Sequence, residues 1–173
     1  TTEWTPSNGA KVIVKPTKFK EDEVHMVAQA LGGTSEYSQE YIPTLLLLGN
    51  IMGNMGLGTY NSNDLSKYLS GKVAGVSVQF NEYSRSVTGA STPKDLPTMM
   101  ELLYMTFTDI NLDANEFAAM QKAVSAALAN QEKNPQHIFS DKMIRTWYNS
   151  PYLKSVTPAD VEAASREQAL KIA

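Results

Sequence analysis

Two adjacent segments of this chain alternate residue types with a period of two, and this feature limits the possible folds more than any other. Val76, Val78 and Phe80 face one way in the first segment, and residues 84–89 repeat the alternation in the second. The tight connection at residues 81–82 predicts an antiparallel hairpin with two distinct faces. Helices laid on one face of such a sheet give an α+β fold.

Further strands are predicted in the first third of the chain. The pair Asn8-Gly9 is a turn signal, and the β-branched residues 12–14 follow it as a short strand. Residues 24–31 form the next predicted strand, which ends at the pair Gly32-Gly33. Because apolar residues occur on both of its sides, we expect both faces of this strand to be covered.

The segments outside these strands are predicted to be helical. Residues 39–55 are apolar nearly all round, which predicts a buried helix, and a short helix is expected at residues 64–69. Four more helices are predicted after the hairpin. Three of them begin at capping signals, which are Thr92, Asp113 and Thr157.

One of the four late helices has no such start signal. It is predicted at residues 136–148, and we expect it to bury Ile144, Trp147 and Tyr148, which share one helical face. No repeat or linker divides the sequence. We therefore expect residues 1–173 to form a single α+β domain in which helices pack on one face of an antiparallel sheet.

Composition excludes several classes of function. The 15 basic and 18 acidic residues give a net charge of −3 without a basic cluster, which argues against a nucleic-acid partner. The apolar run Leu45–Leu48 is far too short to span a bilayer, so no membrane partner is expected. Cysteine is absent, which excludes disulfides, thiolate catalysis and cysteine-bound zinc.

Residues with metal or phosphate chemistry are few. His25 and His137 are the two histidines, they lie far apart in the sequence, and neither belongs to a His-x-x-x-His pair. The glycine-rich run Gly49–Gly58 lacks the Gly-Lys-Ser/Thr ending of a phosphate-binding loop. We interpret this run as a helix end with close backbone packing.

A serine–lysine pair is the remaining catalytic candidate. Ser91 and Lys94 have the Ser-x-x-Lys spacing of penicillin-binding enzymes, and Ser140-Asp141-Lys142 resembles their second motif. The third motif, Lys-Thr-Gly, is missing, and Thr92-Pro93 is already explained as a helix cap. Acyl transfer is therefore kept only as an alternative hypothesis.

The order of several segments resembles that of the pitrilysin/insulinase-type zinc metallopeptidases, the family that includes mitochondrial processing peptidase-like domains. The ordered set covers essentially the whole chain and is most similar to the start of the C-terminal half of bacterial two-half proteins. The segments that carry the resemblance are residues 4–20, 23–36, 65–72 and 88–96, then Asp113, Phe117, Asn134 and Pro135.

The resemblance implies a pitrilysin/LuxS-like metallohydrolase fold, and it also implies where a zinc site would be. Active domains carry His-x-x-Glu-His on the helix that matches Thr44–Leu48, and no His or Glu occurs at residues 41–63. A third ligand would fall in the stretch Val124–Leu128, which has none. We therefore expect no catalytic, cofactor-binding or metal-binding residue in this chain, and zinc only in the catalytic domain of a parent protein.

By resemblance, the chain is expected to be a non-catalytic domain that packs against sister domains and helps enclose an extended peptide substrate. It is expected to be an excised piece, truncated before the last strand of the domain, with a sheet edge that favours self-association. A bacterial cell envelope or periplasm is the expected location. The alternative is a stand-alone module that binds peptides by strand addition at a sheet edge.

Overall fold

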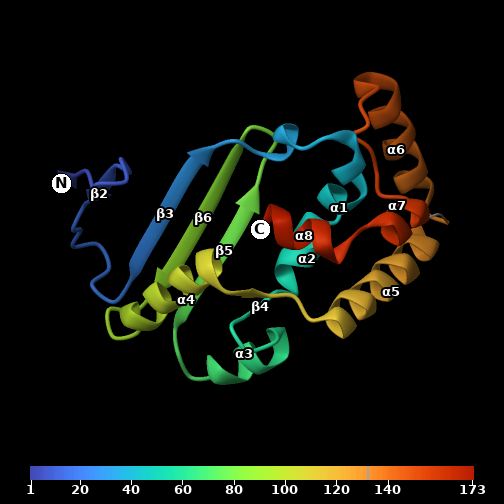
Figure 1. Ribbon diagram of the computed structural model, residues 1–173. Helices are drawn as coiled ribbons and strands as arrows, with labels where there is room; N and C mark the ends of the chain where they lie inside the picture. Colours follow the sequence, from blue (N-terminus) through green and yellow to red (C-terminus); the bar gives the residue numbers. More distant parts are fainter. Residues whose placement is uncertain (132) are drawn as a thin grey trace.

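A computed structural model describes residues 1–131 and 133–173 of the chain (Figure 1). The strands are β1 (Thr2–Trp4), β2 (Val12–Val14), β3 (Val24–Leu31), β4 (Gly56–Leu57), β5 (Ala74–Phe80), β6 (Ser84–Ser91) and β7 (Ile110–Asn111). The helices are η1 (Thr34–Glu36), η2 (Gln39–Tyr41), α1 (Ile42–Leu46), α2 (Leu48–Gly53), α3 (Ser62–Tyr68), α4 (Leu96–Thr108), α5 (Ala114–Gln131), α6 (Pro135–Tyr148), α7 (Pro158–Ala163) and α8 (Arg166–Ile172).

An antiparallel sheet with the strand order β3-β6-β5 forms one side of the molecule, as Figure 1 shows. The predicted hairpin is confirmed, since β5 pairs with β6 from Phe80 opposite Arg85 to Ala74 opposite Ser91. The predicted turn is confirmed too. Gly9 has a φ of 81° between β1 and β2, a left-handed conformation that suits glycine.

Helices cover one face of this sheet, as the alternation of β5 predicts. Val76, Val78 and Phe80 are half-buried, whereas Ser77 and Gln79 on the opposite face are exposed. The covering elements are α4, which packs on β5 and β6, and α2, which packs on β5. The chain therefore has the predicted α+β architecture, and the apolar face of the hairpin gives the sheet its inner side.

The expectation that residues 24–31 are covered on both faces is wrong. Strand β3 is an edge of the sheet, and its Val27 and Leu31 are 73% and 92% exposed. Within the described chain, the helices that cover the sheet pack on β5 and β6 rather than on β3. The mixed apolar pattern of β3 thus leaves large side chains in solvent.

The long helix predicted at residues 39–55 is broken into three pieces. Helices η2, α1 and α2 follow one another, and the backbone leaves the helical conformation at Leu47, where φ is −98° and ψ is 2°. The prediction that this segment is buried is confirmed at Ile42, Leu47, Leu48 and Ile51. The break turns the apolar side chains toward two different neighbours, the sheet and the C-terminal helices.

The capping predictions are confirmed in part. Thr157 and Asp160 form a reciprocal capping box at the start of α7. Asp113 accepts bonds from the backbone N–H groups of Asn115 and Glu116, but the Glu116 carboxylate accepts from Ser62 and Asn63 at the start of α3 instead. At Thr92, a turn held by its side chain precedes α4, which begins at Leu96.

Two predictions about the last helices are wrong. The final predicted helix is divided into α7 and α8, because the chain is extended at Ala164 and Ser165. In α6, Trp147 and Tyr148 are 71% and 58% exposed rather than buried. Helix α6 stands at the outer edge of the helical layer in Figure 1, so its last turn is not covered by the other described elements.

The main core lies among the helices rather than on the sheet. Its buried cluster joins α2 and α5 to α7 and α8, with Leu47 and Ile51 fully enclosed. Its members are Leu47, Ile51, Leu112, Phe117, Met120, Leu128, Val161, Ala164 and Ala169. Within residues 1–131 and 133–173, none of the helices has the length and apolar character needed to cross a bilayer.

Candidate functional site

The stretch Thr44–Leu48 lies against the C-terminal helices, with Thr44, Leu47 and Leu48 buried and the other two residues half-buried. Thr44 is fully buried, and its hydroxyl donates to Gln168 Oε1 at 2.7 Å. The backbone N–H of Ser165 donates to the same hydroxyl oxygen at 3.0 Å. This one polar side chain of the stretch is therefore occupied in joining α1 to the start of α8, and its aliphatic neighbours have no metal-binding atoms.

The second stretch singled out by sequence, Val124–Leu128, lies in the same apolar environment. Leu128 belongs to the buried cluster that contains Leu47, and Val124 packs against that cluster. The structure thus brings together the two stretches in which the resemblance places zinc ligands. Together the two stretches form part of a hydrophobic core. This core has aliphatic side chains where a divalent cation would need nitrogen or oxygen ligands, so a cation does not fit there.

The histidines lie apart from this core. His25 is exposed on β3, with its Nε2 atom 3.1 Å from the Glu23 carboxylate. His137 lies on α6 beside a small cavity of about 190 Å³ that Asp141 and Arg145 also line. In the part of the chain that the structure describes, no cluster of three or more His, Asp or Glu side chains is arranged to hold a metal ion.

Ser91 is the last residue of β6, and Lys94 lies in the turn between β6 and α4. The Ser91 hydroxyl is buried and has no hydrogen-bond partner among the described residues, while Lys94 is exposed. The same turn is held by Asp95, whose carboxylate accepts from the Val73 backbone N–H at 2.9 Å and from the Thr92 hydroxyl at 3.0 Å. These two bonds lower the pKa of Asp95 below its ordinary value. The arrangement explains the motif as a turn between the sheet and a helix.

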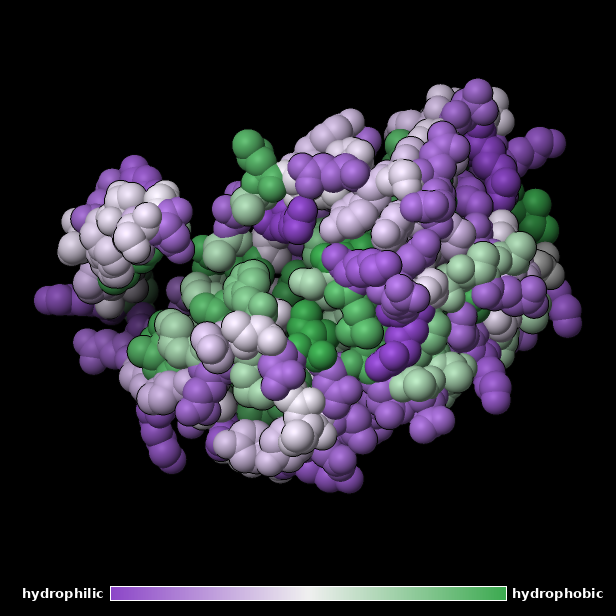
Figure 2. Space-filling view, in the orientation of Figure 1, coloured by the Kyte–Doolittle hydropathy of each residue, from purple (hydrophilic) through white to green (hydrophobic). Residues whose placement is uncertain are grey.

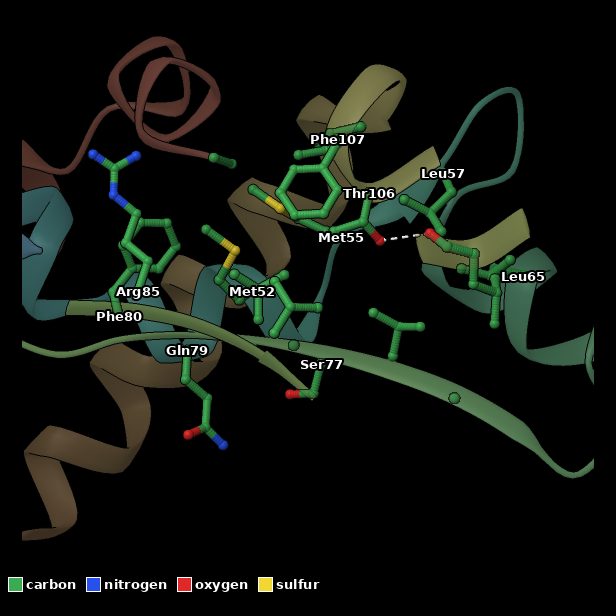
Figure 3. Close-up of a pocket in the computed structure, with 18 of the residues that line it drawn as sticks. Met52, Met55, Leu57, Leu65, Ser77, Gln79, Phe80, Arg85, Thr106 and Phe107 are labelled. Carbon is green, nitrogen blue, oxygen red and sulfur yellow. Dashed lines mark hydrogen bonds between the residues drawn. The ribbon is translucent and has the colours of Figure 1, made fainter. Parts of the chain in front are cut away.

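A groove of about 680 Å³ opens between the sheet and the helices that cover it. Figure 3 shows Met52, Met55 and Phe107 above the strand, with Ser77 and Gln79 turned away from the groove. Figure 2 shows hydrophobic side chains gathered in the centre of this face of the molecule. This groove could not be predicted from local sequence patterns, because it depends on how far α2 and α4 stand from β5.

Arg85 is a groove residue that sequence reasoning missed. It lies opposite Phe80 at one end of the groove, with its guanidinium 5.9 Å from the centre of that ring. The guanidinium donates to the Gly32 carbonyl at 3.2 Å and to the Glu36 carboxylate at 3.1 Å. An arginine on the inner face of an otherwise apolar alternation was the available signal.

Comparison with known proteins finds zinc proteases. No known family profile matches the chain. The chain is 24% identical over 181 residues to the probable zinc protease PqqL of Escherichia coli, covering 96% of the chain and 19% of that protein. It is 23% identical to a PQQL-like zinc protease of Arabidopsis thaliana, covering 87% of the chain and 13% of that protein. The chain therefore spans less than a fifth of the length of these relatives.

Solved structures with the same fold cover nearly the whole chain. The periplasmic protease PqqL of Escherichia coli superimposes on 98% of it with a TM-score of 0.80 and 19% identity, over 19% of that protein. The ferredoxin protease FusC, in complex with Arabidopsis ferredoxin, gives a TM-score of 0.74 at 16% identity over 98% of the chain and 19% of that protein.

An inactive domain is also among the similar structures. The peptidase M16 inactive domain of Pseudomonas fluorescens gives a TM-score of 0.77 at 15% identity, over 99% of the chain and 42% of that protein. M16 denotes the pitrilysin type of peptidase, so the resemblance read from the sequence is confirmed. The chain has the fold of an M16 peptidase domain, and its homologues are PqqL-type zinc proteases and M16-like peptidases.

Proposed function

We propose that residues 1–173 form a single non-catalytic domain of a larger zinc-dependent peptidase, which packs against sister domains and helps enclose the substrate. The observation that carries this proposal is the hydrophobic core formed by Leu47, Val124 and Leu128. Aliphatic side chains cannot bind zinc or act as a general base. This chain therefore supplies no catalytic, cofactor-binding or metal-binding residue, and zinc belongs to another domain of the parent protein.

Two findings from the comparisons support this role. The chain matches only a small part of two zinc proteases, and it also has the fold of an inactive M16 domain. The complex of FusC with ferredoxin supports a polypeptide substrate for the parent protein. The periplasmic location of PqqL supports a periplasmic or cell-envelope location for it.

Zinc content and peptidase activity of the purified chain test the proposal directly. We expect no stoichiometric zinc after dialysis and no cleavage of an unstructured peptide, while the zinc protease PqqL of Escherichia coli serves as the positive control. Stoichiometric, chelator-sensitive zinc together with hydrolysis by this chain would show that it is an enzyme. The Ser91 alternative predicts labelling by a fluorophosphonate or penicillin probe, which the buried Ser91 hydroxyl should not show.

The enclosing role needs a test of its own. In PqqL of Escherichia coli, we expect deletion of the segment aligned with this chain to leave the zinc content unchanged. Cleavage of a protein substrate should fall more than cleavage of a short peptide, because the short peptide depends less on an enclosing wall. Equal losses for both substrates, with zinc retained, would favour a purely structural role over substrate enclosure.

A further inference from the structure

A small hollow lies between α3 and α4, apart from the larger groove on the sheet. Tyr60, which precedes α3, and Tyr68, the last residue of α3, border it together with Thr98 and Glu101 of α4. The rest of its lining is apolar and consists of Leu65, Leu102 and Met105. Ala173, which borders the larger groove, does not belong to this lining.

The size of the hollow limits what it can hold. Its volume is about 120 Å³. One water molecule takes about 30 Å³ in the liquid, and a drug-sized ligand needs a pocket of about 300 Å³ or more. The hollow therefore fits a group of several non-hydrogen atoms, such as the end of one side chain, and is too small for a cofactor.

The hydroxyl groups around the hollow have hydrogen-bonding capacity that the described chain does not use. On α4, the hydroxyls of Thr106 and Thr108 donate to backbone carbonyls one turn earlier, whereas the Thr98 hydroxyl has no such bond among the described residues. The hydroxyls of Tyr60 and Tyr68 also have no hydrogen-bond partner in the described part of the chain. These side chains are therefore available to bind a ligand.

Glu101 gives the hollow a negative charge. Lys, Arg and His are absent from the described residues that line it. The Glu101 carboxylate forms no ion pair within residues 1–131 and 133–173, whereas Asp64 on the neighbouring α3 is paired with Lys67 at 2.9 Å. A charged lining group without a counterion favours a ligand of the opposite sign, so the hollow favours a cation.

The two tyrosine rings also favour a cation. The rings of Tyr60 and Tyr68 stack with their centroids 5.4 Å apart, and the face of an aromatic ring carries partial negative charge. The Lys72 Nζ atom lies 4.1 Å from the centre of the Tyr68 ring, which shows that this pair of rings already attracts one positive group. Lys72 does not line the hollow, so it leaves the space beside Glu101 open.

We propose that this hollow binds the guanidinium group of an arginine side chain. A guanidinium is planar, stacks on aromatic rings, and can donate to a carboxylate and to hydroxyls at the same time. The apolar part of the lining suits the methylene groups of the arginine. The site lies outside the hydrophobic core that carries the proposed function, so this inference does not depend on that function.

Binding of blocked amino acids to the 173-residue chain tests the proposal. The probe is N-acetyl-arginine amide, and the control is N-acetyl-citrulline amide, which has nearly the same shape but a neutral urea group. NMR shifts of the amides of Tyr68, Thr98 and Glu101 report binding. We expect a Kd on the order of 1 mM for the arginine compound and binding about tenfold weaker for the citrulline compound. Equal binding of both compounds would overturn the proposal.

A charge-removing substitution tests the role of the carboxylate. Glu101→Gln keeps the shape of the side chain, and we expect it to raise the Kd of the arginine compound about fivefold to tenfold. The control is Glu162→Gln, which makes the same change of net charge at an exposed position of α7 and should leave the Kd unchanged. Equal weakening by both variants would contradict a site at Glu101.

Two substitutions at Tyr60 test the role of the ring. The Tyr60 side chain is 42% exposed, so we expect both variants to keep the fold, which urea denaturation checks. Tyr60→Phe retains the aromatic face, and Tyr60→Leu removes it. We expect Tyr60→Leu to bind the arginine compound about threefold more weakly than Tyr60→Phe does. Equal binding by the two folded variants would show that the ring does not hold the guanidinium.

The same titration with the full-length parent protein distinguishes two sources of the arginine. Binding as in the isolated chain assigns the site to an arginine of a bound polypeptide, whereas a hollow already filled by an arginine of another domain would not bind the compound. If the 173-residue chain does not bind the arginine compound, this inference alone is overturned. Stoichiometric zinc with hydrolysis would instead remove the proposed function.

Discussion

The helical half and the sheet half of this molecule differ in how completely they are packed. Around Leu47 and Ile51, helices from both ends of the sequence exclude solvent, and the one buried hydroxyl there, on Thr44, has two partners. On the inner face of the sheet, Val76 and Val78 are only half-buried and border a groove of about 680 Å³. The two stretches in which the resemblance places zinc ligands of active domains belong to the filled region, and the open space lies on the sheet.

The contrast separates a packed region, whose side chains cannot bind a metal ion, from an open region on the sheet. Aliphatic residues at positions where metal ligands could stand increase the buried apolar area and leave no metal-binding atom at the same place.

Leucine-to-alanine substitutions in the two halves should show the largest difference. We expect Leu47→Ala to lower the free energy of unfolding by about 3–4 kcal/mol, since Leu47 is fully enclosed. Leu65→Ala, at the wall of the groove, removes a half-buried side chain and should lower it by about 1 kcal/mol. Urea denaturation measures the free energy of unfolding of both variants. Similar losses in the two variants would contradict the contrast between a filled and an open region.

The bonds of Thr44 should give the next largest effect. Thr44→Val keeps the shape of the side chain but leaves the Ser165 N–H and the Gln168 amide without their partner. We expect a loss of about 1–3 kcal/mol in the free energy of unfolding, because buried polar groups without partners are destabilising. Thr44→Ser retains the hydroxyl and is the control. If both variants lose the same stability, the hydroxyl does not connect α1 to α8 in the way described.

The capping box of α7 should make the helical half sensitive to acid. Burial alone raises the pKa of Asp160, but its bonds with Lys154 and Thr157 outweigh burial and lower the pKa below its ordinary value. A lowered pKa in the folded state means that the carboxylate stabilises the fold at pH values above its ordinary pKa, and that this stabilisation disappears as pH falls through the lowered pKa of the folded state.

Asp160→Asn tests this dependence. We expect it to lower the free energy of unfolding by about 1 kcal/mol at neutral pH. The difference from the unsubstituted chain should shrink as pH falls through the lowered pKa of Asp160, where the aspartate itself becomes protonated in the folded state. Denaturation curves at several pH values provide the measurement. A difference that stays constant through the acid range would show that the charge of Asp160 is not responsible.

The smallest expected effect is a gain in stability on the open side. Gly49→Ala adds a methyl group where no atom lies within 4 Å, so it should raise the free energy of unfolding by about 0.5–1 kcal/mol through helix propensity. A loss of stability would show that Gly49 is needed for packing within the domain.

Sequence reasoning succeeded where a local pattern determines structure. The alternation of Val76, Val78 and Phe80 predicted both the hairpin and its inner face, and Thr157 with Asp160 predicted a capped helix start. The ordered resemblance to pitrilysin-type peptidases led to the right fold. The expectation that this chain binds no zinc rests on the aliphatic side chains at Thr44–Leu48 and Val124–Leu128. It remains a prediction, which the measurement of zinc content tests.

Features that depend on distant contacts were not predictable in this way. The break at Leu47 coincides with a change of neighbours, from the C-terminal helices around α1 to β5 and α5 around α2, and helical periodicity does not predict such a change. Helical periodicity placed Trp147 on an inner face, but exposure depends on whether another helix reaches that turn. The groove and the role of Arg85 likewise depend on the spacing between elements that are far apart along the chain.

The partners of Thr44 also determine when this domain can be completed during synthesis. Gln168 lies 124 residues further along the chain, so the Thr44 hydroxyl has no partner there until those residues have been synthesised and have left the ribosome. Until then, the apolar side chains beside it are open to chaperones or to other unfinished chains. Contacts of such long sequence separation slow folding, so the region that is most tightly closed in the finished protein is among the last to close.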